Sequence, residues 1–172
     1  MLVLQKKVIM ADTPTQPCLL VVWHSRTGAS EAMARAVSDA GKATLIHCDA
    51  VTPETLRSAS GYVFVCPENL GTMSGSMKEM FDRTYYPVLG QLEGRPFASI
   101  IAAGSDGSGA QRQMDKIVTG WRLRRISEPI ICNFDAQTPE SILASKTVSN
   151  ADLKQCRALG EGFAEALSQG IF

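Results

Sequence analysis

Five short apolar runs, each followed by a segment of helical periodicity or by a turn, constrain the fold of this chain most strongly. The runs are largely continuous rather than alternating with polar residues, as expected of strands buried on both faces of a parallel sheet. Strands that alternate with helices predict a three-layer α/β sandwich. Because right-handed crossovers leave few topologies, we expect a five-stranded parallel sheet of order 2-1-3-4-5. The five runs are CLLVVW (18–23), ATLIHC (43–48), GYVFVC (61–66), FASIIAA (97–103) and ISEPIIC (126–132).

Helical spacing of apolar residues predicts the helices between these runs. The first is expected to end at Gly41, and another to begin after Thr52-Pro53, where a hydroxyl cap precedes a proline. Pro129 lies inside the last apolar run and indicates an edge strand. The start of the chain reads as a tail over residues 1–16, followed by one domain over 17–172. The predicted helices cover about 29–40, 53–59, 76–86, 109–124 and 150–168.

Charge and cysteine content argue against several classes of protein. Lys and Arg together number 17, as do Asp and Glu, and this balance argues against nucleic-acid binding. It also argues against a small acidic electron carrier, which uses its net charge to dock. No apolar run approaches the roughly 18 residues of a membrane span, and the N-terminus is not a convincing signal peptide. The five cysteines form no CxxC pair, so we expect a cytoplasmic protein with buried, reduced thiols.

Three loops rich in glycine and hydroxyl groups follow the first, third and fourth apolar runs. We call HSRTGAS (24–30) the first loop, PENLGTMSG (67–75) the second loop and GSDGSG (104–109) the third loop. In an open α/β sheet, ligands bind beyond the carboxyl ends of the strands, where these three loops meet. Each has an ordinary alternative, such as a helix cap by Thr27 or Ser30 in the first loop. Three such loops at one edge nevertheless favour a ligand site.

The first loop has the features of an anion site. Gly28 allows close backbone approach, and the following helix offers free amide groups and the positive end of its dipole. The sequence lacks GxxxxGK[ST], GxGxxG after the first strand, and GxSxG, which argues against a P-loop, a dinucleotide-binding domain and a nucleophile elbow. Trp23-His24 and Cys66 stand where a phosphate-receiver domain needs acidic residues. The two histidines, His24 and His47, are too few for a histidine-rich metal site, and we expect no metal.

The loops resemble those of a known family. SRTGAS resembles the flavodoxin phosphate loop, S/T-x-T-G-x-T. PENLGTMSGSMKEMFDR resembles P-E-Y-x-G-S-x-P-G-x-L-K-x-x-x-D of NAD(P)H-dependent FMN reductases, although Asn69 replaces the tyrosine and Ser74 the proline. The flavodoxin-like NAD(P)H:quinone oxidoreductases are similar too, and LEGRPFASIIAAGSDGSGAQ resembles the next strand and third flavin loop of both groups. The resemblance covers about residues 18–133 and implies a flavodoxin-like fold.

The resemblance also implies how FMN is held. The first loop would bind the phosphate, the second the isoalloxazine ring, and the third would border the ring and the ribityl chain. The implied cofactor contacts are Ser25, Arg26, Thr27, Gly28, Ala29 and Ser30, then Pro67, Glu68, Asn69, Leu70, Gly71, Thr72 and Met73, and finally Gly104, Ser105, Asp106 and Gly107.

By the same resemblance, the chain is an FMN-dependent oxidoreductase that takes hydride from NAD(P)H and reduces a quinone or similar small acceptor. It would act as a homodimer or homotetramer. The flavin carries the chemistry, so no side chain is assigned as catalytic. The second and third loops contain no aromatic residue, which leaves a flavin face open and argues against a carrier. A flavodoxin-like electron carrier and a flavin-free flavodoxin-fold binding domain remain the alternatives.

Overall fold

A computed structural model describes residues 17–172, and the expected tail over residues 1–16 lies outside this range. The strands are β1 (Leu19–Trp23), β2 (Thr44–His47), β3 (Gly61–Asn69), β4 (Thr72–Met73), β5 (Pro96–Ala103), β6 (Arg124–Arg125) and β7 (Ile130–Asn133). The α-helices are α1 (Ala29–Gly41), α2 (Pro53–Ser58), α3 (Gly75–Thr84), α4 (Ser108–Gly120), α5 (Pro139–Leu143) and α6 (Asn150–Ser168). Two 3₁₀ helices, η1 (Cys48–Ala50) and η2 (Tyr86–Val88), complete the set.

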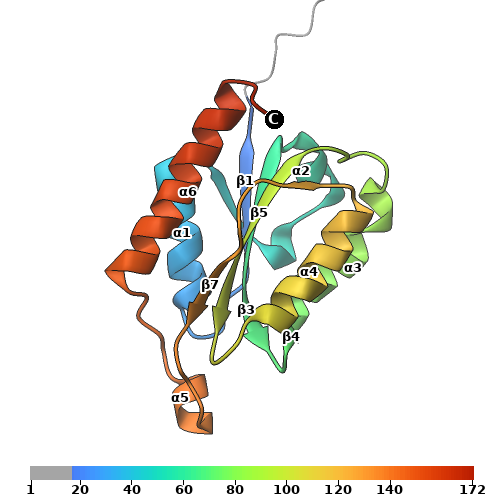
Figure 1. The fold of residues 1–172 in the computed structure, drawn as a ribbon. Coiled ribbons are helices and arrows are strands. Elements are labelled where there is room, and N and C mark those ends of the chain that lie inside the picture. Colours follow the sequence, from blue (N-terminus) through green and yellow to red (C-terminus); the bar gives the residue numbers. More distant parts are fainter. Residues whose placement is uncertain (1–16) are drawn as a thin grey trace, which may run out of the picture.

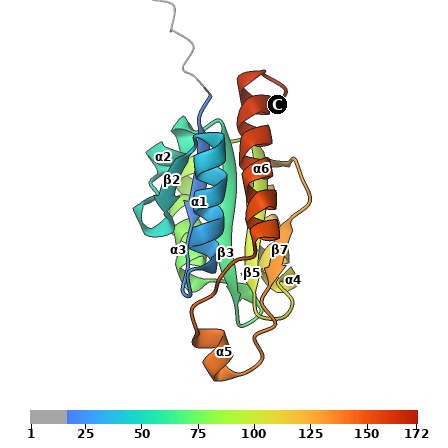
Figure 2. The same ribbon diagram turned by 90° about the vertical axis from the view of Figure 1, so that its left-hand side faces the viewer.

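The strand order confirms the expected flavodoxin-like topology. β2, β1, β3 and β5 pair in parallel in that order, and both β6 and β7 pair in parallel with β5 at the edge. Helices α1 and α6 cover one face of the sheet, while α2, α3 and α4 cover the other (Figure 1, Figure 2). None of the helices within residues 17–172 combines the length and apolarity needed to cross a membrane.

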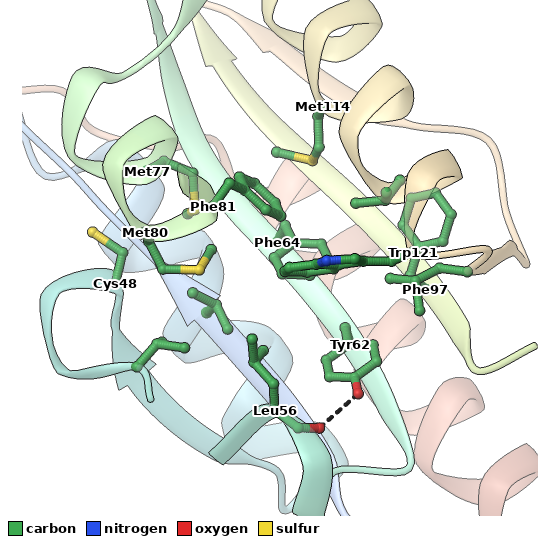
Figure 3. Packing of buried hydrophobic residues seen from close by; sticks show 14 of the residues in the cluster. Cys48, Leu56, Tyr62, Phe64, Met77, Met80, Phe81, Phe97, Met114 and Trp121 are labelled. Carbon is green, nitrogen blue, oxygen red and sulfur yellow. Dashed lines mark hydrogen bonds between the residues drawn. The ribbon is translucent and has the colours of Figure 1, made fainter. Parts of the chain in front are cut away.

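The central strand β3 supplies both layers of the core. Tyr62 and Phe64 belong to the hydrophobic cluster under α3 and α4, whereas Val63 and Val65 belong to the cluster under α1 and α6. This division follows from the alternation of side chains along a strand and explains why the run is continuously apolar. Trp121 packs in the first of these clusters (Figure 3) with only 1% of its surface exposed. It is therefore a core residue.

The expected boundaries differ from the structure in two places at the sheet edge. The fifth apolar run forms a strand only after its proline: β7 begins at Ile130, and the short strand β6 lies before the run. Pro129 has no amide to donate to a ladder. Helix α4 ends at Gly120 rather than near residue 124, and Arg122 adopts a left-handed φ of 56°. Two arginines that follow the helix pair with carboxylates: Arg122 with Glu93, and Arg125 with Asp115.

Candidate functional site

The first loop joins β1 to α1 and leaves the helix N-terminus without a side-chain cap. Gly28, with a φ of 92°, is the N-cap residue, a conformation that favours glycine. Ser25 Oγ accepts a hydrogen bond of 3.1 Å from the Gly28 amide. The capping alternative for Thr27 or Ser30 is therefore wrong, because neither side chain caps the helix. The positive end of the α1 dipole instead faces the loop and can receive an anion.

Ser30 carries a hydroxyl that the described residues do not satisfy. Its side chain is 1% exposed, and Oγ has no hydrogen-bond partner within residues 17–172. A buried polar atom without a partner costs on the order of 1–3 kcal/mol, so such atoms are rare and call for an explanation. An acceptor atom of a ligand bound at the first loop would satisfy this hydroxyl. The donor set of the loop therefore fits a phosphate.

The second loop is a hairpin rather than the irregular loop expected from its sequence. β3 continues to Asn69 and pairs antiparallel with β4, with Glu68 opposite Met73 and Asn69 opposite Thr72. Both residues of the two-residue turn have positive φ, 52° at Leu70 and 72° at Gly71, as in a type I′ turn. A leucine is unusual in this conformation, and its side chain is fully exposed at the tip. The hairpin makes the second loop a defined wall of the site.

Glu68 fastens the second loop to the third. Its two carboxylate oxygens accept hydrogen bonds from the amides of Gly107, at 3.0 Å, and Ala110, at 2.9 Å. The carboxylate thus caps α4, whose N-cap residue Gly107 has a φ of 86° and no capping side chain of its own. The resemblance placed Glu68 against the isoalloxazine ring. In the structure Glu68 lines the cavity described next, but both of its oxygens are occupied by the α4 backbone.

A cavity of about 210 Å³ opens where the three loops meet. Seven of the residues expected to bind the cofactor line it, and they come from all three loops: Arg26, Thr27, Ala29, Pro67, Glu68, Asn69 and Gly104. The other ten belong to the same loops but do not line the cavity: Ser25, Gly28, Ser30, Leu70, Gly71, Thr72, Met73, Ser105, Asp106 and Gly107. The structure also adds cavity residues that the sequence did not single out: Ala102, Ala103, Phe134, Ala136, Ile142, Leu143 and Lys146.

Five of these additional residues lie in a segment that follows β7, which we call the strap (residues 134–146). The strap contains α5, which begins with a capping box between Thr138 and Ser141 and has Pro139 at its first position. Thr138-Pro139 repeats the signal that predicted a helix after Thr52-Pro53. Applied here as well, that signal would have indicated the helix. Nothing comparable in the sequence places the strap next to the first loop, since this depends on where the sheet edge ends.

His24 connects the first loop to the end of the second. Its Nδ1 lies 2.8 Å from Ser74 Oγ, and its ring centroid lies 5.7 Å from that of His47. Burial lowers the pKa of His24, and the charge of His47 and, more weakly, of Arg26 lowers it further, while Asp49 opposes them. We therefore expect the folded protein to hold His24 neutral at pH 7.

Acidification should destabilise the protein through His24. The folded-state pKa lies below the unfolded value of about 6.5, so the unfolded chain binds more protons between those two values. The stability that neutral His24 contributes is present above about pH 6.5 and is lost as the pH falls towards the folded-state pKa. Denaturant unfolding at pH 7.5 and 5.5 measures this effect. Between these pH values, the free energy of unfolding should fall less for His24→Gln, which keeps a partner for Ser74, than for the wild type. Equal losses in both proteins would contradict this assignment.

One cluster of metal-ligating residue types lies near this histidine pair. Atoms of His47, Cys48 and Asp49 that could ligate a metal lie within 4.8 Å of one another. Burial raises the pKa of the Cys48 thiol to about 12, which keeps it protonated at neutral pH. Arg83 binds the carbonyl oxygens of Cys48 and Asp49 and brings positive charge next to the cluster. This neighbouring cation disfavours a metal ion there.

The strand order, the glycine-bearing first loop before α1 and the cavity at the carboxyl edge define a flavodoxin-like α/β protein. Residues 29–132 match the family described as NADPH-dependent FMN reductase, and the chain belongs to this family. A flavodoxin of Aquifex aeolicus is 25% identical in an alignment of 158 residues that covers 86% of this chain and 85% of that protein. The chain is therefore a flavin-binding oxidoreductase or a flavodoxin-like protein.

Solved structures support the fold independently. A WrbA-like flavodoxin from Agrobacterium tumefaciens superposes with a TM-score of 0.68 at 20% identity, covering 89% of this chain and 98% of the other. An archaeal flavodoxin gives the same TM-score at 18% identity, over 87% of this chain and 97% of the other. At such identities the likeness establishes the fold alone.

Proposed function

We propose that this protein is an FMN-dependent oxidoreductase of the cytoplasm that takes hydride from NAD(P)H and reduces a quinone or similar small acceptor, as a homodimer or homotetramer. The start of α1 carries the proposal, because it has no side-chain cap and its Ser30 hydroxyl has no partner within residues 17–172, and both features fit a bound phosphate. Membership of the reductase family supports the redox activity. Bound FMN would supply a centre that accepts hydride and returns reducing equivalents.

The residues of the chain would bind and orient the cofactor rather than take part in proton transfer. The uncapped start of α1 would hold the phosphate, with Arg26 adding positive charge at the cavity wall. The β3–β4 hairpin, fixed to α4 by Glu68, would give the ring a rigid edge. Ala102, Ala103 and Gly104 at the end of β5 leave space because their side chains are small or absent.

The experiment that tests the proposal is a visible spectrum of the protein with FMN, followed by anaerobic addition of NADH or NADPH. We expect a bound-flavin spectrum that bleaches rapidly. A protein that binds no FMN would refute the proposal. The relative from Aquifex aeolicus favours a second candidate, an electron carrier, and bound flavin that neither pyridine nucleotide can bleach would support it.

Ser30→Ala should change stability and cofactor affinity in opposite ways. Removing an unsatisfied buried hydroxyl should raise the free energy of unfolding without flavin by about 1 kcal/mol. The same change should weaken FMN binding several-fold, because the phosphate loses a donor. Denaturant unfolding and fluorescence titration with FMN measure the two effects.

Ser38→Ala is the matched control on the same helix. Ser38 is also buried, but its Oγ donates to the Ala43 carbonyl at 2.8 Å. Its removal should lower stability by about 1 kcal/mol and leave FMN affinity unchanged. If Ser30→Ala destabilised the flavin-free protein as Ser38→Ala does, the Ser30 hydroxyl would have a partner within the protein, and its assignment to a phosphate would be wrong.

A further inference from the structure

The strap crosses the cavity and is attached on both sides of it. At its start, the amides of Phe134 and Ala136 donate to the carbonyls of Ala103, at 2.9 Å, and Gly104, at 2.8 Å. At its end, the Lys146 amide donates to the Thr27 carbonyl at 2.8 Å. The strap thus connects the end of β5 with the first loop. Its helix α5 lies beyond the carboxyl ends of the strands (Figure 1, Figure 2).

The strap lies outside residues 29–132, which match the family. It adds large apolar side chains to the cavity that the three loops do not provide. The second and third loops contribute no aromatic side chain to the cavity, whereas the strap contributes Phe134. The strap also contributes Ile142 and Leu143 from α5, so most of the large apolar side chains of the cavity come from this segment.

Ile142 and Leu143 are exposed although they line the cavity. Their exposed fractions are 51% and 71%, which is high for large apolar side chains that face a concave site. Their position is fixed: the Lys146 ammonium group donates to the carbonyls of Ser141, Ile142 and Ala144 and so holds the end of α5. An apolar surface that is held in place and exposed to solvent, in a cavity that also has polar lining residues, is suited to contact with a ligand.

We propose that the strap is the outer wall of the FMN site and that Ile142 and Leu143 pack against bound FMN, retaining it as a resident prosthetic group. This rests on the proposed function. The cavity combines two cations, Arg26 and Lys146, with the apolar strap, and FMN combines an anionic phosphate with a largely apolar ring system. If the apolar side chains of the strap become buried only when FMN is bound, they slow the dissociation of FMN more than its association.

The test compares Ile142→Ser/Leu143→Ser with the wild type in FMN dissociation, measured by fluorescence after mixing with an excess of another flavin-binding apoprotein. We expect dissociation at least 10-fold faster, with association within about threefold and an unchanged melting temperature without FMN. Leu89→Ser/Ile171→Ser is the control, because both residues are exposed apolar side chains that do not line the cavity. Its dissociation rate should match the wild type.

Dissociation from the strap variant within twofold of the wild type would overturn the role of the strap while leaving the proposed function intact. A wild-type protein that binds no FMN would instead refute the proposed function itself. Hydrogen exchange gives a second measure: amides of residues 138–146 should gain protection when FMN is added. Unchanged exchange there would also overturn the proposal.

Lys146→Met distinguishes two roles of Lys146: holding the strap in place and attracting the phosphate by its charge. The variant loses the ammonium group but keeps the backbone amide that is bonded to Thr27. If the strap acts as a wall, dissociation of FMN and of riboflavin, which lacks the phosphate, should accelerate by similar factors. An effect confined to FMN would mean that Lys146 acts on the phosphate alone, and this would overturn its role in holding the wall.

Discussion

Gly160→Ala should be among the most destabilising alanine substitutions in the chain, lowering the free energy of unfolding by about 2–3 kcal/mol. A Cβ at Gly160 would lie 2.2 Å from the Val37 carbonyl oxygen, which belongs to the backbone of α1 and cannot rotate away. Gly41 faces the same contact, since its own Cβ would lie 2.6 Å from the Gly160 carbonyl oxygen. Helices α1 and α6 therefore pack backbone to backbone, and added volume forces them apart.

Gly162→Ala is the control for this substitution. It lies on the same helix, but a Cβ there would meet no atom of residues 17–172 within 4 Å. Alanine should stabilise the helix at this exposed position by about 0.5–1 kcal/mol. Thermal unfolding should thus show a fall of roughly 4–12 °C for Gly160→Ala and a small rise for Gly162→Ala. Equal melting temperatures would mean that α1 and α6 are not in close contact in solution.

This helix contact also matters for the site, because α1 carries the first loop at its N-terminus. Moving α1 away from α6 shifts Gly28 relative to the strap, whose last residue is bonded to Thr27. Gly160→Ala is therefore expected to weaken FMN binding as well, although neither Gly160 nor Gly41 lines the cavity.

The sheet could be predicted from the sequence because burial on both faces leaves a direct pattern of continuous apolar residues. The run GYVFVC became β3, whose side chains divide between the two core clusters. Right-handed crossovers left few strand orders to choose from. The edge was harder to predict. At Pro129 a local backbone constraint outweighed the apolar pattern, and the strand expected over 126–132 begins only at Ile130.

The site could be predicted only in part, for a different physical reason. Glycine and hydroxyl content identified the three loops as a ligand site. Each loop follows a predicted parallel strand, which places all three at one edge of the sheet. The sequence could not reveal that Ser30 has no partner among residues 17–172, or that amides at the start of α4 bind the oxygens of Glu68. Both depend on contacts between segments distant in the chain. The strap was missed because its relation to the first loop is tertiary, although the local signal for α5 is visible at Thr138-Pro139.

Gly109→Ala should separate the second and third loops and reduce FMN affinity at least 10-fold. A Cβ at Gly109 would lie 2.0 Å from the Gly71 carbonyl oxygen and 3.2 Å from a carboxylate oxygen of Glu68. The tip of the β3–β4 hairpin must therefore move away from α4. This movement also strains the bonds from Glu68 to the α4 amides, so we expect a stability loss of about 1–3 kcal/mol.

Gly75→Ala is a matched control, because Gly75 also lies in the first turn of a helix that follows a loop of the site. A Cβ there would meet no atom within 4 Å in the described part of the chain, so both FMN affinity and stability should stay close to the wild type. FMN titration by fluorescence, with circular dichroism to verify the fold, measures the difference. If Gly109→Ala keeps wild-type affinity despite a displaced hairpin, the second loop does not hold the flavin, and the cofactor must be bound by the first loop, the end of β5 and the strap. The comparison thus decides whether the close contact between Gly71 and Gly109 serves the flavin site or only the packing of α4.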